Sequence, residues 1–255
     1  MRGRRMLPVP RRVSVAAALA LAAGVLAGCV AALPAPAPRW AEPAPTPPKN
    51  PASVGYADLA DPAWVSAVSE ATGIPARQLA AYAAAAIVKH DTMPECVFSW
   101  TTLAAIGWIE SDHGRHDGSE VDADGRVSPP IYGVALDGDG VALIPDSDGG
   151  EIDADAHLDR AVGPFQMIPQ SWRNWHIDID GDGVADPQDI DDASMAATNY
   201  LCRASKPQDT EEGWRAAVEA YNSATTYVGE VAARAVAYGE AAQSVVGASV
   251  TPAAG

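Results

Sequence analysis

The sequence predicts a mostly α-helical fold with one long, irregular and acidic insertion. Apolar residues recur at helical spacing over most of residues 61–239, whereas residues 117–160 show no clean period and are rich in Gly and Asp. Twenty of the 33 acidic side chains lie between residues 112 and 192, where there are four arginines and no lysine. We therefore expect a helical body whose middle segment forms loops and short β-pieces.

Residues 1–28 have the features of an export signal. Five arginines and no acid precede a run of small apolar residues, which ends in the letters LAGC at residues 26–29. This end resembles the lipobox of bacterial lipoproteins, in which the signal is cut before the cysteine and Cys29 receives lipid. The alternative is an uncleaved membrane anchor, because the apolar run can be extended to Leu33. Either interpretation predicts an exported domain on the outer face of the cytoplasmic membrane.

Residues 29–51 are expected to form a tether between the lipid and the domain. Proline and alanine alternate there, a composition that favours an extended, semi-rigid chain over a helix or a sheet. Residues 241–255 are small, Ala-rich and uncharged, and we expect a flexible tail. The folded domain then occupies residues 52–240.

Cys96 and Cys202 remain if Cys29 carries the lipid. An even pair of cysteines in an oxidising compartment predicts a disulfide, and closing a loop of this length stabilises a fold by up to about 4.7 kcal/mol in the chain-entropy model. Two free buried thiols are the alternative.

The net charge is −16. Without the five arginines of the signal it is −21, because 12 basic and 33 acidic residues then remain. Such a surface repels phosphate backbones, which excludes nucleic acid as a partner. The acids of the middle segment are dense enough to call for neutralising cations.

The first predicted helix covers residues 61–73. Asp61 is suited to be its N-cap, Pro62 stands in its first turn, and Gly73 is a stop signal. An Ala-rich helix is predicted over residues 74–90.

Further helices are predicted along the rest of the chain. Residues 97–110 are apolar nearly all round and should form the central buried helix. A shorter helix is expected over residues 163–175, another over 191–204, and two or three more over 211–239.

The segment DIDGDGVADPQD, residues 178–189, matches the ligand register of an EF-hand calcium loop. The predicted ligands are Asp178, Asp180, Asp182, Val184 through its carbonyl, Asp186 and Asp189. Position 12 is Asp189 where glutamate is usual, and its shorter arm changes or weakens coordination. The alternative is a solvated, Asp-rich turn. We expect a structural Ca²⁺, because calcium is plentiful outside the cell.

Residues 137–155 echo this pattern without the full register. A second cation there is one interpretation, and a loop that lines a cleft is the one we favour.

Glu110 is an isolated acid at the end of the predicted buried helix. Desolvation and the negative end of the helix dipole both disfavour a carboxylate there, so we expect a raised pKa for Glu110. An acid that stays protonated near neutral pH is a proton donor, which glycosidic cleavage requires. The alternative is a glutamate that points to water, and the spacing alone does not separate the two.

Three motifs follow one another in order: IESDHG at residues 109–114, GPFQMIP at 163–169 and AYN at 220–222. Together they resemble the soluble lytic transglycosylase family and its goose-type lysozyme relatives. The flanking DRAVGPFQMIPQSW and the EF-hand-like loop are closer to the membrane-bound lytic murein transglycosylase B branch, and the Lys-poor composition suits an actinobacterial member. The resemblance covers residues 51–239 and implies an α+β lysozyme-like catalytic domain.

The resemblance also implies site residues. Glu110 matches the single catalytic acid, and Ser111 matches a serine whose hydroxyl orients the carboxyl or a sugar. Gln166 matches a glutamine that contacts the sugar beside the cleaved bond. Tyr221 and Asn222 match a phenol and an amide near the acid.

Two features near these motifs are set apart from the family's site. Pro164 and Phe165 depart from the Leu and Met that are frequent in the family, which should alter packing under the glutamine more than the chemistry. Asp112, His113 and His116 are expected to be non-catalytic residues at the rim of a cleft.

The resemblance implies cleavage of the MurNAc–GlcNAc β-1,4 bond of peptidoglycan without hydrolysis, giving 1,6-anhydroMurNAc ends. Glu110 would act first as general acid and then as base, with no organic cofactor, in a protein that is a monomer. A muramidase that uses water is the nearest alternative. A non-catalytic, calcium-stabilised murein-binding lipoprotein is the alternative of another class.

Overall fold

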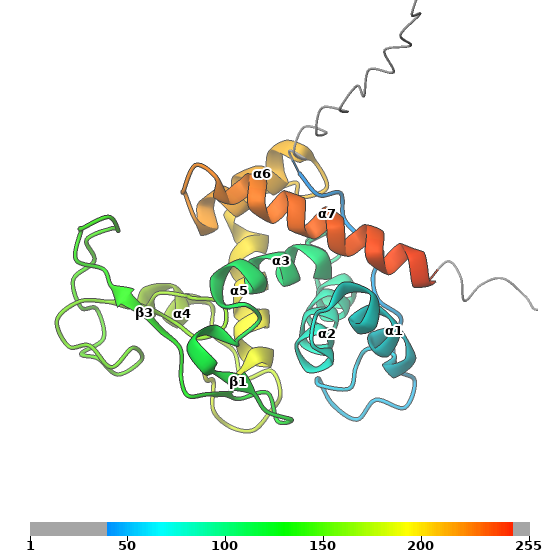
Figure 1. Cartoon of the computed structure of the whole chain (residues 1–255), viewed down its shortest axis with the longest axis horizontal. Helices are drawn as coiled ribbons and strands as arrows, with labels where there is room; N and C mark the ends of the chain where they lie inside the picture. Colours follow the sequence, from blue (N-terminus) through cyan, green and yellow to red (C-terminus); the bar gives the residue numbers. More distant parts are fainter. Residues whose placement is uncertain (1–39, 247–255) are drawn as a thin grey trace, which may run out of the picture. The chain divides into compact units, whose positions relative to one another are not determined.

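The computed structural model describes residues 40–246, which belong to the unit Ala37–Gly255. The predicted signal peptide, the lipidation site Cys29, the tether up to residue 39 and the tail from residue 247 lie outside the described residues. Within them the fold is mostly α-helical, with two short antiparallel β-ribbons (Figure 1), as the sequence predicts. The α-helices are α1 (Pro62–Thr72), α2 (Ala76–Thr92), α3 (Trp100–Ser111), α4 (Pro169–Trp175), α5 (Ile190–Ala204), α6 (Glu211–Tyr221) and α7 (Tyr227–Val246).

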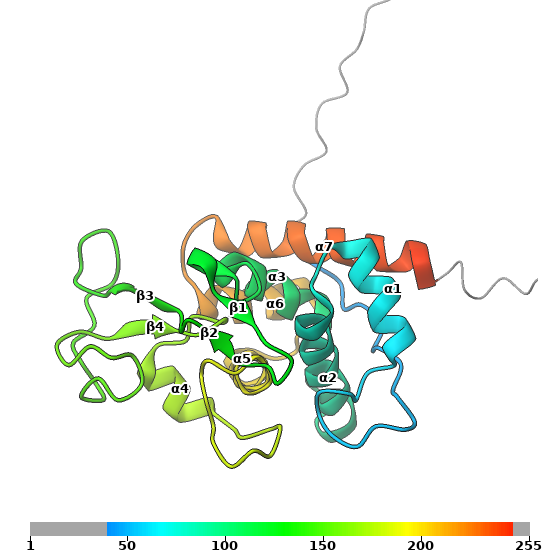
Figure 2. The same ribbon diagram turned by 60° about the horizontal axis from the view of Figure 1, so that its bottom comes forward.

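The apolar helix α3 is central, as predicted. Every residue from Trp100 to Gly107 is buried, because α3 contacts α2, α5 and α7 on different sides. The long helix α7 crosses α3 and α1 (Figures 1 and 2). Helix α5 packs against α2, α4 and α6. Since α3 is enclosed up to its last turn, the residues at its C-terminus are the first of this helix that reach the surface.

The helix ends follow from local sequence signals. The Asp61 carboxylate accepts hydrogen bonds from the amides of Ala63 and Trp64, which confirms it as the N-cap of α1. Gly73 ends α1 in the left-handed conformation, with φ 74°, as predicted.

The predicted disulfide is present. Cys96, just before α3, is bonded to Cys202 on α5, with their Cα atoms 5.3 Å apart. It joins segments 106 residues apart in sequence, so the central helix is tied covalently to its neighbour.

The insertion consists of loops and short β-pieces, which confirms the prediction. A 3₁₀ turn, η1 (His116–Gly118), leads into strands β1 (Glu120–Val121) and β2 (Val127–Ser128), which pair antiparallel. Strands β3 (Tyr132–Ala135) and β4 (Arg160–Val162) form the second ribbon, with a register shift between Tyr132 and Ala135. The loops between β3 and β4 project from the helical body (Figure 2).

The helix predicted over residues 163–175 begins only at Pro169, so this prediction is wrong at its start. Val162 and Met167 instead exchange backbone hydrogen bonds around a tight turn of residues 163–166. Gly163 adopts φ 71°, and a Cβ there would overlap the carbonyl of Pro187. Glycine is therefore required where the turn meets the loop that precedes α5.

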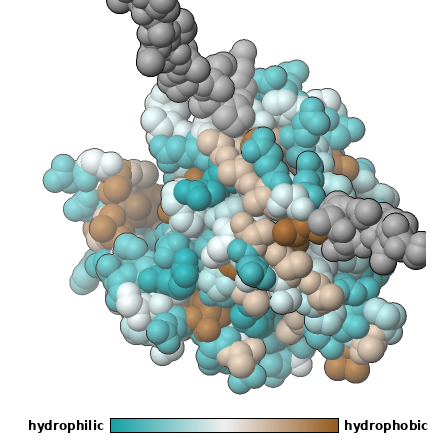
Figure 3. Space-filling model, turned by 45° about the vertical axis from the view of Figure 1, so that its right-hand side comes forward, coloured by the Kyte–Doolittle hydropathy of each residue, from teal (hydrophilic) through white to brown (hydrophobic). Residues whose placement is uncertain are grey.

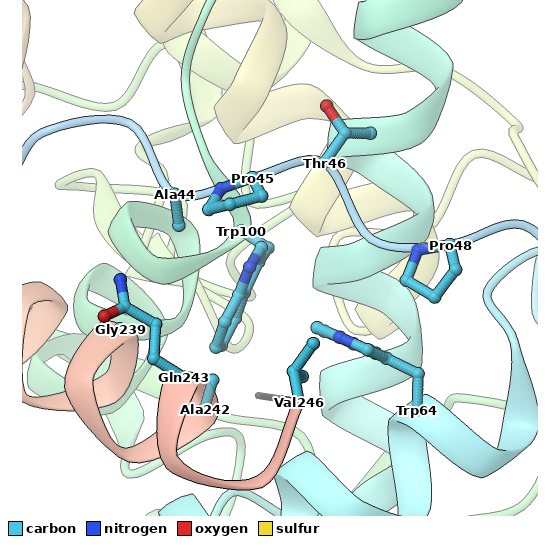
Figure 4. A pocket seen from close by; sticks show the side chains of 10 residues that line it. All are labelled: Ala44, Pro45, Thr46, Pro48, Trp64, Trp100, Gly239, Ala242, Gln243 and Val246. Carbon is cyan, nitrogen blue, oxygen red and sulfur yellow. The ribbon is translucent and has the colours of Figure 1, made fainter. Parts of the chain in front are cut away.

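Packing begins earlier in the chain than residue 52. Ala41 is buried, and Trp40 and Ala44 pack against the core, so part of the segment predicted as tether lies on the domain. Figure 4 shows this segment beside Trp64 and Trp100. At the other end, α7 continues to Val246, six residues into the predicted tail.

The outer surface in Figure 3 is largely hydrophilic with small apolar patches. Among the described residues, no helix combines the length and the apolar composition that a membrane span requires.

Candidate active site

Glu110 lies in the last turn of α3, half-buried, just before the chain turns away at Asp112 (φ 51°). Burial raises the pKa of Glu110 from its ordinary 4.5 to about 7. A hydrogen bond from Tyr227 opposes this effect and lowers the pKa in part. The carboxyl is therefore present in both protonation states near neutral pH, as a group that gives and takes back a proton must be.

Tyr227, the first residue of α7, was not singled out from the sequence. It is buried, and its hydroxyl donates a 2.5 Å hydrogen bond to Oε1 of Glu110. Burial, followed by the nearby Glu110 charge, raises the pKa of the Tyr227 phenol, so it remains a donor. The signal available in the sequence was its position six residues after Tyr221, on the helix that follows the AYN motif.

The turn of residues 163–166 is fixed by two hydroxyls from distant motifs. Ser111 donates to the carbonyl of Pro164 at 2.7 Å, and Tyr221 donates to the carbonyl of Phe165, also at 2.7 Å. Phe165 itself is fully buried, with its ring edge-on to Tyr82. The three motifs of the sequence thus meet, and two of them hold the third.

Ser111 contacts backbone groups of its own helix, of the loop after it and of the turn. It is buried, and its hydroxyl also contacts the carbonyl of Gly107 and accepts from the amide of Gly114. With three backbone partners, this side chain positions the turn.

Gln166 is held with φ 47°, and its side-chain nitrogen donates to the carbonyl of Gly163. It lines a cavity of about 180 Å³ together with Tyr221 and four residues that the sequence interpretation missed: Met167, Ile168, Ser171 and Tyr200. Burial, followed by the charge of Glu110, raises the pKa of the Tyr221 phenol.

Asn222 lies apart from this cavity lining. It is the C-cap of α6, and its side-chain oxygen accepts from the amide of Ala224. The structure therefore uses Asn222 to shape the loop that leads to Tyr227.

A second depression, of about 580 Å³, surrounds the end of α3. Glu110, Trp108, Asp112, His116 and Glu230 are among its lining residues. Asp112 and His116 thus border a recess as predicted.

His113 is buried and does not lie at the rim, contrary to prediction. Its two ring nitrogens lie 3.1 Å from the hydroxyls of Tyr82 and Tyr238. Burial lowers the pKa of His113 to about 4, so the ring is neutral at neutral pH. Gly107 makes room for this network, because a Cβ there would lie 2.6 Å from the Tyr82 hydroxyl.

The EF-hand-like loop brings together only part of the predicted ligand set. Carboxylate oxygens of Asp178, Asp180 and Asp192 lie within 4.8 Å of one another, as do those of Asp180, Asp189 and Asp191. Asp191 and Asp192 stand at the start of α5 and were not predicted as ligands.

The other predicted ligands have different surroundings. Asp182 and Asp186 both pair with Arg126, and Val184 is largely exposed. Asp191 also pairs with Arg77 at 2.6 Å. The cluster therefore centres on Asp180 and the start of α5, away from the middle of the loop.

The donor set of this cluster consists of oxygen atoms, which suits a hard cation such as Ca²⁺. Burial and the neighbouring carboxylates raise the pKa of Asp189 to about 7 and that of Asp192 to about 6. A cation would favour the charged forms that the protein alone disfavours. The donors thus fit Ca²⁺.

Asp146, Asp148 and Asp159 form another acidic group, in the 137–155 region and just beyond it. Their oxygens largely accept from backbone amides of the same loop. These bonds shape the projecting loop.

The cavity in Figure 4 is a poor candidate for catalysis. It measures about 300 Å³ and lies between the N-terminal segment, Trp64, Trp100 and the end of α7. No titratable side chain lines it, so this cavity offers no group for proton transfer.

No protein-family model and no curated protein matches the chain. Among solved structures, the Escherichia coli lytic transglycosylase SLT35 in complex with bulgecin A is similar at 15% identity, over 74% of this chain and 79% of that one, with a TM-score of 0.33. The same enzyme in complex with calcium is similar at 16% identity, over 74% of this chain and 80% of that one, with a TM-score of 0.34. SltB3 from Pseudomonas aeruginosa, in complex with NAG-anhNAM-pentapeptide, is similar at 20% identity, over 56% of this chain and 44% of that one, with a TM-score of 0.27. Such identities and TM-scores do not establish a shared family.

Proposed function

We propose that the chain is a lytic transglycosylase that cleaves the MurNAc–GlcNAc β-1,4 bond of peptidoglycan and leaves 1,6-anhydroMurNAc ends. One observation carries the proposal: a half-buried Glu110 with a pKa of about 7 is bonded to Tyr227, and its charge raises the pKa of Tyr221, which lines a cavity with Gln166. The order of the three sequence motifs supports the choice of substrate.

A single acid is sufficient for this reaction. Glu110 donates its proton to the glycosidic oxygen as the bond to C1 of the muramoyl sugar breaks. The 6-hydroxyl of the same sugar then attacks C1, and Glu110 takes up the hydroxyl proton. No water is consumed, and the enzyme returns to its initial protonation state. General acid–base catalysis of this kind contributes about 10²- to 10⁴-fold.

The surrounding side chains divide the remaining work. Tyr227 donates to the Glu110 carboxylate that exists between the two proton transfers. Gln166 presents its amide to the cavity from a turn that Ser111 and Tyr221 immobilise. Rigid support of this kind lowers the cost of positioning the sugar.

Digestion of purified murein, followed by mass measurement of the muropeptides, tests the proposal. We expect anhydro ends, which are lighter by one water, and a loss of at least about 100-fold in rate for Glu110→Gln, with a melting temperature no lower than that of the wild type. Hydrated ends as the only product would establish a muramidase. Murein turnover that survives Glu110→Gln would instead favour the non-catalytic binding protein.

We further propose that the cluster around Asp180 holds one structural Ca²⁺. Asp178, Asp189 and Asp192 would complete a carboxylate set of the hard-donor type. The ion would fix the loop before α5 and thereby the turn that Gly163 packs against it. Its chemistry in the reaction is limited to support of the fold.

The proposed localisation rests on the sequence. We infer that the chain is an exported, monomeric lipoprotein of the membrane-bound transglycosylase B type, with lipid on Cys29. Mass spectrometry of the N-terminal peptide from the membrane fraction tests this, and Cys29→Ser should release the protein from that fraction.

A further inference from the structure

Trp108 is an exposed indole next to the acid. It lies two residues before Glu110 on α3 and is 37% exposed, although every residue of α3 from Trp100 to Gly107 is buried. An aromatic side chain left partly in water beside a recess is a feature of binding sites. Trp108 borders the same 580 Å³ depression as Glu110.

One face of this indole is already covered. The guanidinium carbon of Arg234 on α7 lies 3.4 Å from the centre of the Trp108 ring. Within the described residues, Arg234 forms no ion pair with a carboxylate, although the chain has 33 acidic residues. Its neighbours are Trp108 and, at 5.7 Å, the ring of Tyr238. Arg234 therefore makes a cation–π contact with the indole.

Helix α7 fixes the indole and the acid together. Tyr227 and Arg234 are seven residues apart on this helix, which places them about two turns apart on one face. Tyr227 bonds to Glu110, and Arg234 stacks on Trp108. Trp108 thus contacts the guanidinium on one face and also borders the depression.

The charge of the recess limits what the indole can receive. Asp112 and Glu230 line it together with Glu110, and Asp112 pairs with Arg115. The charges that remain are Glu230 on the lining and Arg234 on the indole, and a neutral ligand group is compatible with both. A neutral pyranose can pack its apolar C–H face on an indole.

We propose that Trp108 is a stacking platform for the peptide-free N-acetylglucosamine ring of the glycan, and that Arg234 is the positioning residue that holds it. The inference rests on the proposed function, and it places the peptide-bearing muramoyl sugar on the side of Gln166 and Tyr221. Trp108 thus determines which sugar occupies which side of Glu110.

Binding of the neutral N-acetylglucosamine tetramer to a Glu110→Gln background, followed by calorimetry, tests this assignment. Trp108→Ala should weaken binding about tenfold and Trp108→Phe less, because one stacked ring contributes on that order. Arg234→Met should weaken it about threefold, with Arg234→Lys in part restoring it. Arg203→Met, an exposed arginine on α5, is the matched control and should change nothing.

A second readout covers the case in which Trp108→Ala fails to fold. In protein labelled with 5-fluorotryptophan, the resonance that Trp108→Phe removes should shift when the tetramer is added. If the Trp108 resonance does not shift, or if a folded Trp108→Ala variant binds the tetramer with unchanged affinity, Trp108 is not a stacking platform. The murein digest tests the proposed function separately. Anhydro products together with a Trp108 resonance that does not shift would contradict the stacking role of Trp108 and leave the proposed function intact.

Discussion

The hydroxyl of Tyr227 lies 2.5 Å from Oε1 of Glu110, so the first residue of α7 touches the acid in the last turn of α3. Because this hydrogen bond lowers the pKa of Glu110, its loss should raise that pKa above about 7. For Tyr227→Phe we expect the alkaline fall of kcat/KM to move to higher pH. The maximal rate should drop about tenfold, since a hydrogen bond to a charged group is lost. Rates of murein cleavage between pH 5 and 9 measure both effects, and Tyr56→Phe, a buried tyrosine that bonds to Ala81, should leave the pH limb in place.

Glu110→Gln should stabilise the protein at alkaline pH. The folded-state pKa of Glu110 is raised from 4.5 to about 7, so folding takes up a proton between these values and the wild type loses stability as pH rises through them. The variant should therefore match the wild type near pH 4.5 and exceed it by about 2 kcal/mol above pH 7, allowing for solvent screening of a half-buried group. Urea unfolding at several pH values checks this, and Glu240→Gln is the exposed control. A difference independent of pH would contradict the raised pKa.

Ser111 and Tyr221 should show coupled energetics, because they hold adjacent carbonyls of one turn. We expect Ser111→Ala and Tyr221→Phe each to lower the free energy of unfolding by about 1–3 kcal/mol, since each leaves a carbonyl without its partner. The double variant should lose less than the sum, by about 0.5 kcal/mol or more. Strict additivity in denaturant unfolding would mean that the turn is held by other contacts.

Removal of calcium should lower the melting temperature. At a concentration 100 times its Kd, a bound ion adds about 2.7 kcal/mol to stability. Chelation should reverse this gain, and Asp180→Asn should abolish the response to added Ca²⁺, because Asp180 belongs to both carboxylate groups. Asp146→Asn, in the projecting loop, is the matched control. If neither the chelator nor Asp180→Asn changes the melting temperature, the protein does not hold this ion.

Gly107→Ala should destabilise the domain by about 1–3 kcal/mol, because the new methyl would lie 2.6 Å from the Tyr82 hydroxyl and displace it from His113. Tyr82→Phe removes the clashing oxygen. The double variant should therefore be more stable than the sum of the single changes in thermal unfolding. If Tyr82→Phe brings no relief, the strain lies elsewhere.

Local signals explain why most helices could be predicted. Asp61 and Gly73 mark the ends of α1 by cap chemistry that depends only on neighbouring residues. The residues of α3 are apolar on every face of the helix, which likewise predicted burial on all sides. The turn at residues 163–166 could not be predicted in this way, because Gly163 is held by a contact with Pro187, a residue far along the chain.

The site was predictable where one residue's own chemistry decides its role. Glu110 stood out as an acid after an apolar run, and burial raises its pKa as expected. Tyr227 was missed because its partner comes from another helix, 117 residues away in sequence. The contact of Ser111 with the Pro164 carbonyl was missed because a backbone partner carries no side-chain signal in the sequence. The pairing of Asp182 and Asp186 with Arg126 was likewise not predicted, because Arg126 lies more than 50 residues earlier in the chain.

Helix α7 has 20 residues and starts at Tyr227, so its far end lies about 30 Å from the acid. That end reaches the apolar cavity of Figure 4. The helix therefore separates the acid from the C-terminal end of the described chain by a fixed distance. An affinity handle or a fluorescent reporter attached beyond Val246 therefore starts one full helix length away from the scissile linkage.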